Sequence, residues 1–144
     1  AKRDEYKIQS ELDNYTKEMQ KIRKQNALSR PVSQCIEYID SHLNEHLTLA
    51  VLSEQIGLSA GHLSAIFKKE MNQTIGEYIQ NMRIETAKNM LNYSEYTYSQ
   101  ISSALAFSSQ SHFTKVFREK TGYTPREYRM KYYTKSITTL GESE

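Results

Sequence analysis

The sequence predicts an all-α protein with two helix-turn-helix units, a long helix between them and an amphipathic helix in front. Three observations support this prediction. The 144 residues include only 2 prolines and 5 glycines, so few residues disfavour helices. Apolar residues recur at helical spacing, and no segment shows a convincing two-residue period. Finally, a stretch of about 50 residues is repeated, and its helix caps and core positions match in the two copies.

Charge is unevenly distributed along the chain, although the net charge is only +2. Residues 1–30 carry eight basic and five acidic side chains, residues 31–96 carry four and eight, and residues 97–144 carry seven and four. Basic charge therefore gathers at the two ends. The single cysteine, Cys35, cannot form an intramolecular disulfide, and no apolar run approaches the length of a membrane span. We expect a cytoplasmic protein without a membrane partner.

Residues 1–29 are predicted to form a helical linker. Its apolar residues follow the alternating four-three spacing of a heptad stripe, formed by Ile8, Leu12, Tyr15, Met19 and Ile22. So short a stripe is marginal for a coiled coil by itself. The linker is therefore either a dimerising helix or an amphipathic helix that lies on its own or a missing domain. Because the chain begins with Ala1 rather than Met, we expect a fragment that lacks an N-terminal domain, although a processed protein would look the same.

A second helix is expected to begin near Pro31, which suits a first helical turn, and to end within residues 44–47. Its apolar face is formed by Val32, Ile36, Ile39 and Leu43. Three further helices follow, and each begins at a residue whose side chain can cap it: Thr48, Ser59 and Thr74. Gly57 is expected to end the first of the three.

The same pattern then occurs again, with Thr97, Ser108 and Thr124 as the predicted caps. The two copies align with an offset of 49 residues up to Ser108 and with an offset of 50 after one extra residue. In each copy a helix, a short turn and a second helix follow one another, which is the helix-turn-helix plan. A helical solenoid would share this pattern, but two copies are too few and the period is too long.

The second helix of each copy leaves a set of side chains that do not pack inward. They are Ala60, Gly61, Ser64, Ala65 and Lys68 in the first copy, and Ser109, Gln110, Ser111, Thr114, Lys115 and Arg118 in the second. The second set combines short polar side chains with basic ones. Such a face suits the major groove of DNA, and the basic residues at the helix ends suit phosphates.

Residues 47–129 resemble the DNA-binding domain of the AraC/XylS family. The resemblance is strongest in the second copy, which reads S-H-F-T-K-V-F-R over residues 111–118 and G-Y-T-P-R-E-Y-R over residues 122–129. It implies two lobes joined by a long central helix at about residues 74–92, each with one recognition helix in the major groove. Residues 30–136 would be the DNA-binding domain, with helix-turn-helix units at about 48–70 and 97–120, and residues 137–144 would be a flexible tail.

The resemblance also assigns roles to individual residues. The residues expected to contact bases are Gln110, Ser111, Thr114 and Lys115 in the second copy, and Ser64, Gly61 and Ala65 in the first. The residues expected to contact phosphates are Ser59, His62, Lys68, Lys69, Ser108, His112, Arg118, Lys120, Thr124 and Arg126.

The sequence departs from the family's pattern at two places. Gly61 and Ala65 stand where many members have large polar side chains, so we expect few base contacts from the first recognition helix. Ala106 stands where the family commonly has glycine. If that residue has a left-handed backbone, alanine costs roughly 1 kcal/mol there.

Together these observations predict a bacterial transcription regulator that binds double-stranded promoter DNA sequence-specifically. We expect a homodimer, formed through the linker or a missing sensor or receiver domain, with RNA polymerase as a further candidate partner. The alternative is a helical protein-interaction module with a degenerate helix-turn-helix. We expect no enzyme, because no catalytic triad or phosphate-binding loop is present. His42, His46 and Cys35 are too few and too far apart for zinc, and no metal or cofactor is expected.

Overall fold

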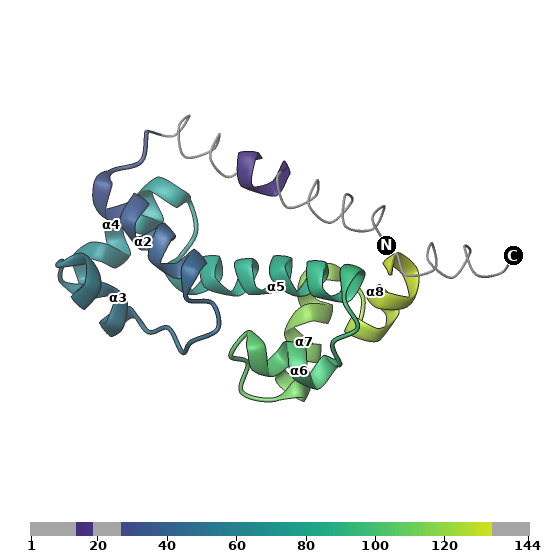
Figure 1. Ribbon diagram of the computed structural model, residues 1–144. Helices are drawn as coiled ribbons and strands as arrows, with labels where there is room; N and C mark the ends of the chain where they lie inside the picture. The colour runs from purple at the N-terminus through teal and green to yellow at the C-terminus, as the bar shows by residue number, and fades with distance from the viewer. Residues whose placement is uncertain (1–13, 19–26, 134–144) are drawn as a thin grey trace, which may run out of the picture. The chain divides into compact units, whose positions relative to one another are not determined.

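The computed structural model describes residues 14–18 and 27–133, and every regular element in these ranges is a helix. The all-α fold class is therefore confirmed. Residues 14–18 are helical, and seven longer helices follow (Figure 1). They are α2 (Arg30–Ser41), α3 (Leu49–Ile56), α4 (Ala60–Met71), α5 (Ile75–Tyr93), α6 (Tyr98–Ala104), α7 (Gln110–Thr121) and α8 (Pro125–Tyr132). None of the described helices combines the length and apolar character needed to cross a membrane.

The chain divides into two compact units, and the boundary falls inside α5, between Arg83 and Ile84. We call α2, α3, α4 and α5 up to Arg83 the first unit. The second unit consists of α5 from Ile84 onward, α6, α7 and α8. Each unit contains one of the two helix-turn-helix pairs that the repeat predicts, α3 with α4 and α6 with α7.

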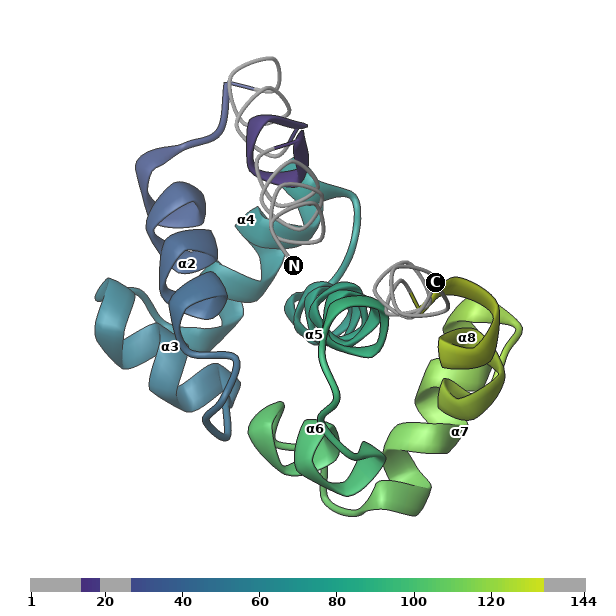
Figure 2. The same ribbon diagram turned by 45° about the vertical axis from the view of Figure 1, so that its right-hand side comes forward.

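In the first unit, α2 contacts both helices of the pair, and the three helices lie together in both views (Figures 1 and 2). The side chains at their centre have no exposed surface: Val32, Cys35, Ile36, Ile39, Leu52, Leu63 and Phe67. Tyr78 of α5 packs edge-on against Phe67, with ring centroids 5.7 Å apart. Its hydroxyl donates a 2.9 Å hydrogen bond to Asp40, so α5 is tied to α2 as well as to α4.

The second unit has a more aromatic core. Its buried side chains are Ile84, Ala87 and Leu91 of α5, Ile101 and Leu105 at α6, and Phe113, Val116 and Phe117 of α7. The Phe117 ring lies 5.7 Å from that of Phe113 and 5.3 Å from that of Tyr128, both edge-on. Burial raises the pKa of the Tyr128 hydroxyl, and a hydrogen bond with Asn92 acts in the opposite direction.

Most of the predicted helix caps are present. The side-chain oxygens of Thr48, Ser59 and Thr97 each accept a backbone N–H from the first turn of the helix that follows. Thr124 and Glu127 form a reciprocal capping box, and Thr74 with Glu77 does the same at the start of α5. These local hydrogen bonds fix where the helices begin.

One predicted cap is wrong, because Ser109 caps α7 rather than Ser108. The Ser109 side chain accepts the backbone N–H of His112 at 3.0 Å. Ser59 therefore corresponds to Ser109, and Ser108 is itself the extra residue of the second copy. Since the two serines are adjacent, either could cap the helix, and the conformation of the preceding turn decides between them.

The end of α2 also differs from the prediction. The helix stops at Ser41, where the backbone N–H of His42 turns back to the carbonyl of Ile39 at 3.0 Å. Leu43 is half-buried beyond the helix rather than on its apolar face. His42 and His46 consequently do not lie on one helical face.

Four residues after the helix-turn-helix helices have left-handed backbones. Gly57 has a φ of 85° and its counterpart Ala106 has a φ of 61°. Asn72 has a φ of 59° and its counterpart Gly122 has a φ of 85°. Each unit thus has glycine at one of the two turns only. The left-handed backbone that the sequence analysis considered for Ala106 is therefore present, and alanine is strained there.

The repeat extends one helix further than the sequence indicates. With an offset of 52, buried Val32, Cys35 and Ile39 of α2 correspond to Ile84, Ala87 and Leu91 of α5. Asp40 and Asn92, which follow Ile39 and Leu91, correspond as well. Asp40 is hydrogen-bonded to Tyr78, and Asn92 is hydrogen-bonded to the equivalent tyrosine, Tyr128. Each unit is therefore built from four equivalent helical segments.

An arginine holds the connection after the first helix of each unit. In the first unit, Arg83 donates from Nε to the carbonyl of Leu43 at 3.2 Å and from Nη2 to that of Glu45 at 2.6 Å. Burial lowers the pKa of Arg83. In the second unit, Arg129 holds the end of α5.

Arg129 makes the larger set of contacts. Its guanidinium donates to the carbonyls of Leu91 at 3.1 Å, Ser94 at 3.2 Å and Met90 at 3.4 Å. The same group lies over the rings of Tyr98 and Tyr133, 5.3 and 5.8 Å from their centroids. The Met90 carbonyl also accepts the backbone N–H and the hydroxyl of Ser94. Carbonyls at a helix end lack partners further along the helix, so this cation supplies donors to Leu91 and Ser94 and complements the helix dipole.

Candidate functional site

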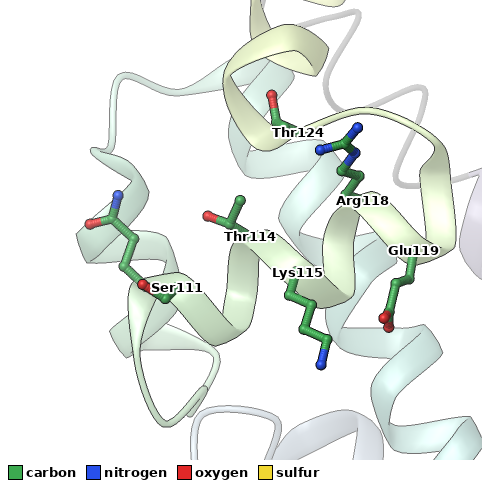
Figure 3. Close-up of a pocket in the computed structure, with 7 residues that line it drawn as sticks. Ser111, Thr114, Lys115, Arg118, Glu119 and Thr124 are labelled. Atoms are coloured by element: carbon green, nitrogen blue, oxygen red, sulfur yellow. The ribbon is translucent and has the colours of Figure 1, made fainter.

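The exposed side of α7 carries two parallel rows of polar side chains. Residues four apart lie one above the other on a helix. One row is Gln110, Thr114 and Arg118, and the other is Ser111, Lys115 and Glu119. Thr114 is half-buried and the other five are exposed. Figure 3 shows Lys115 and Glu119 extending to the same side of the helix.

Both rows line an open groove of about 830 Å³, together with Thr124 at the start of α8. Four of its lining residues are those that the sequence assigns to base contacts in the second copy, namely Gln110, Ser111, Thr114 and Lys115. These four residues present an amide, two hydroxyls and an ammonium, and the guanidinium of Arg118 also lines the groove. These groups donate hydrogen bonds to the acceptors found on base edges and phosphates.

The first turn of α7 holds a serine and a histidine in contact. Ser108 Oγ lies 3.1 Å from Nδ1 of His112, and the imidazole ring packs edge-on against Phe107 at 5.7 Å. Ser109 meanwhile accepts the His112 backbone N–H. Ser108 and His112 are both exposed, so two residues expected to contact phosphates lie together at the start of the recognition helix.

Basic residues flank the turn between α7 and α8. Arg118 and Lys120 lie in the last turn of α7 and Arg126 lies in the first turn of α8, and all three are exposed. Thr124 accepts the Glu127 backbone N–H, while its own backbone N–H donates to the Glu127 carboxylate at 2.8 Å. That bond is the main reason why the pKa of Glu127 is lowered. The Thr124 hydroxyl hydrogen is not used in this capping box.

The exposed side of α4 is much poorer in hydrogen-bonding groups. Gly61, Ser64 and Ala65 are all exposed, and Ser64 alone of these three has a polar side chain. A Cβ added at Gly61 would meet nothing within 4 Å, so no packing requires glycine there. The residues expected to contact phosphates are also exposed: Ser59, His62, Lys68 and Lys69. The first copy therefore offers basic charge but few base-reading groups.

Sequence reasoning missed Glu119, which lines the α7 groove beside Lys115. The residues predicted to face DNA from this helix are all neutral or basic, and Glu119 is not among them. The spacing of four residues from Ser111 to Lys115 to Glu119 is the signal that would have identified it. In the first copy, the corresponding position is Lys69.

The predicted dimerisation stripe can be located only at Tyr15, which is half-buried and belongs to the helical residues 14–18. Ile8, Leu12, Met19 and Ile22 lie outside the described residues. The role of the stripe stays a prediction.

A family model described as a helix-turn-helix domain matches residues 52–131, which is more than half of the chain. The chain belongs to the AraC-type helix-turn-helix family. The matched region contains α3 from Leu52 onward, all of α4, α6 and α7, and the α7 groove. The family resemblance expected from the sequence is thus confirmed, and with it DNA-binding transcription regulation as the function of the family.

Curated relatives of this AraC-type chain include two bacterial proteins. An uncharacterized HTH-type transcriptional regulator of Staphylococcus aureus is 37% identical over 98 residues, and the uncharacterized HTH-type transcriptional regulator YobQ of Bacillus subtilis is 40% identical over 98 residues. Each alignment covers 68% of this chain, but only 13% of the first relative and 41% of YobQ. The chain therefore spans less than half the length of either relative.

Solved structures with the same fold include C-terminal domains of two response regulators. The AraT domain from Geobacillus stearothermophilus has a TM-score of 0.72 and 26% identity, and the match covers 74% of this chain and 89% of that one. The yesN domain from Fusobacterium nucleatum has a TM-score of 0.67 and 30% identity, and covers 70% and 99%. The DNA-binding domain of AdpA, solved in complex with a target DNA, has a TM-score of 0.69 at 21% identity, which shows similarity of fold.

Proposed function

We propose that this AraC-type domain binds duplex DNA sequence-specifically in the major groove, with α7 as its main base-reading helix, and so regulates bacterial transcription. One observation carries the proposal: Gln110, Ser111, Thr114 and Lys115 line a single exposed groove. Lysine donates to guanine O6 and N7, glutamine pairs with adenine, and short hydroxyls adapt to either.

The two recognition helices have unequal roles in this proposal. On α4, Ser64 is the single polar side chain among the three residues expected to face bases, and Gly61 and Ala65 provide only small apolar surface. Lys68 and Lys69 lie in the last turn of the same helix. We infer that α4 mainly binds phosphates, with Ser59 and His62 at its N-terminal end, and that it orients the domain on the duplex.

Phosphate contacts on the second unit come from both ends of α7 and from the start of α8. Arg118, Lys120 and Arg126 supply cations, and Ser108, His112 and Thr124 supply neutral donors. Cations that neutralise phosphates release counterions, so the affinity should fall steeply as the salt concentration rises.

Binding of the 144-residue chain to a random duplex library, repeated over a salt series, tests the proposal. We expect one enriched motif and a linear fall of the logarithm of the binding constant with the logarithm of the salt concentration. Absence of binding even at low salt would contradict the proposal. That result would favour the alternative function, a helical protein-interaction module with a degenerate helix-turn-helix.

A double variant, Gln110→Ala with Lys115→Ala, tests the assignment of α7. Each good base contact that is lost should lower discrimination by about 1–3 kcal/mol. Lys120→Ala is the matched control, because it removes one charge from the same helix outside the groove. The control should weaken binding to all sequences about equally. If the preferred sequence survives in the double variant, α7 is not the main reader.

We further propose that the whole protein acts in the cytoplasm as a homodimer at promoter DNA, with RNA polymerase as a candidate partner. Dimerisation through residues 1–29 predicts that the 144-residue chain sediments as a dimer and that residues 27–144 sediment as a monomer. The shorter chain keeps Ser29, the N-terminal cap residue of α2. Equal masses for the two chains would contradict a role of the linker.

A further inference from the structure

Glu119 is a carboxylate on a surface that otherwise carries donors and positive charge. It is exposed, it lines the α7 groove, and it follows Ser111 and Lys115 in one row along the helix (Figure 3). The row therefore ends in a group that can only accept hydrogen bonds when it is ionised.

In the first unit, the acidic residue at the end of the recognition helix, Glu70, lies at a different position of the repeat and has a different contact. There the order is Lys69 then Glu70, whereas the second unit has Glu119 then Lys120. Glu70 accepts the backbone N–H of Ser29 at 2.8 Å, so its carboxylate holds the start of α2. In the second unit, the acidic residue instead occupies the position of Lys69, on the exposed side of the recognition helix.

The carboxylate of Glu119 is not neutralised by its neighbour in the row. Both Lys115 and Glu119 lie in the part of the chain that the structure describes, and they form no ion pair with each other there. A lysine placed four residues before a glutamate is also the weaker order for such a pair. On bound DNA, the carboxylate would be repelled by phosphates unless it met a hydrogen-bond donor.

Donors in the major groove are the exocyclic amino groups of cytosine and adenine, and a carboxylate is suited to N4 of cytosine. Four residues of an α-helix span about 6 Å, which is close to two base-pair steps of about 3.4 Å. The side chains of Lys115 and Glu119 can therefore reach base pairs one or two steps apart.

We propose that Glu119 is a specificity-determining residue that accepts a hydrogen bond from cytosine N4, one or two base pairs from a guanine bound by Lys115. The inference rests on the proposed function, since it requires α7 to lie in the major groove. It adds one residue and one base preference to that function. It also predicts that the reader helix uses an acceptor as well as donors.

The test is selection from one random duplex library with the 144-residue chain and with the variants Glu119→Ala and Glu119→Lys. The selected site and its single-base variants are then titrated at one salt concentration. Glu54→Ala is the matched control, because Glu54 is exposed on α3 and its loss removes the same charge away from the α7 groove. Circular dichroism confirms that each variant is folded.

We expect the wild-type motif to contain one cytosine position that depends on residue 119. Glu119→Ala should lower discrimination at that position about tenfold and leave the others unchanged. Glu119→Lys should change the preferred base there to guanine, and Glu54→Ala should keep the wild-type motif.

Four results would overturn the inference. One is that Glu119→Ala binds every sequence more tightly by the same factor, with the motif unchanged, since the carboxylate would then act only by repulsion. Another is that Glu54→Ala alters the same position. If the wild type selects a clear motif with no position that depends on residue 119, the inference fails while the proposed function stands. If the wild type selects no motif, both fail.

Discussion

The two units share their interior but differ in the surface of their recognition helices. Phe67 and Phe117 are equivalent, fully buried residues, and each packs edge-on against the equivalent tyrosine, Tyr78 or Tyr128. Among the exposed residues, Gly61 and Ala65 of α4 correspond in the repeat to Ser111 and Lys115 of α7. The buried residues therefore match in the two units, whereas the exposed residues differ, which is why we propose unequal roles for the two helices.

A second difference concerns how firmly each unit holds the connection after its first helix. Arg129 donates to three carbonyls and lies over two aromatic rings. Arg83 donates to two carbonyls. The unit that we propose as the main base reader thus has the more strongly held connection before its helix-turn-helix. Three experiments can break or sharpen this comparison.

The largest effect is expected from the arginines. Arg129→Ala should lower the free energy of unfolding by about 2–3 kcal/mol, because it leaves several carbonyls without a charged donor. Arg83→Ala should cost about 1–2 kcal/mol. Urea denaturation followed by circular dichroism measures both. Lysine at either position should not restore stability, since it lacks the planar fork of donors.

Arg118→Ala is the control for these variants, because Arg118 is exposed on α7 and should change stability by less than about 0.5 kcal/mol. If Arg129→Ala lowers the free energy of unfolding no more than this control does, other contacts hold the connection. If Arg83→Ala costs as much as Arg129→Ala, the two units do not differ in this respect.

Substitutions at the residues with left-handed backbones should change the free energy of unfolding by an intermediate amount, with opposite signs at the equivalent positions 57 and 106. Ala106→Gly should stabilise the protein by about 0.5–1 kcal/mol, because glycine relieves the strain at a φ of 61°. Gly57→Ala should destabilise it by about 1 kcal/mol. Asn72→Gly should change stability less, since asparagine tolerates this conformation. Urea denaturation gives all three values, and a destabilising Ala106→Gly would contradict the strain.

The smallest expected effect is on how the free energy of unfolding changes with pH in acid. A hydrogen bond from the Thr124 backbone lowers the pKa of Glu127, so folding favours the charged carboxylate. Its stabilisation is complete above the pKa of the unfolded chain and is lost as the pH falls through the lower, folded value. The stability difference between the wild type and Glu127→Gln should therefore shrink from pH 7 to pH 3. A difference for Glu127→Gln that stays constant over this pH range would contradict the prediction.

Local features of the fold were predictable from sequence, and features that depend on distant contacts were not. The caps Thr48, Thr97 and Thr124 each involve a side chain and a backbone N–H three residues later, so their pattern is visible in the sequence. The choice between Ser108 and Ser109 depends on the shape of the preceding turn. The two arginines bind backbone carbonyls 35 to 40 residues away, and any residue can supply a carbonyl.

The same distinction applies to the candidate site. The face formed by Gln110, Ser111, Thr114 and Lys115 follows from helical spacing, and these side chains do line one groove. Glu119 belongs to that groove as well and was missed, although it continues the four-residue spacing of Ser111 and Lys115. The repeat of the first helix was also missed, because Val32 and Cys35 correspond to Ile84 and Ala87 with no identical residue between them. Burial preserved apolar character there rather than identity.

Cys35 gives the first unit a built-in reporter of its opening. It is the one cysteine of the chain, it has no exposed surface, and burial raises its pKa to about 11. Because only the thiolate reacts rapidly, a thiol reagent can label this residue only when the surrounding helices separate. Its equivalent in the second unit is Ala87, which has no reactive group. The rate of thiol labelling in the native protein therefore follows local opening around α2 without any engineered probe.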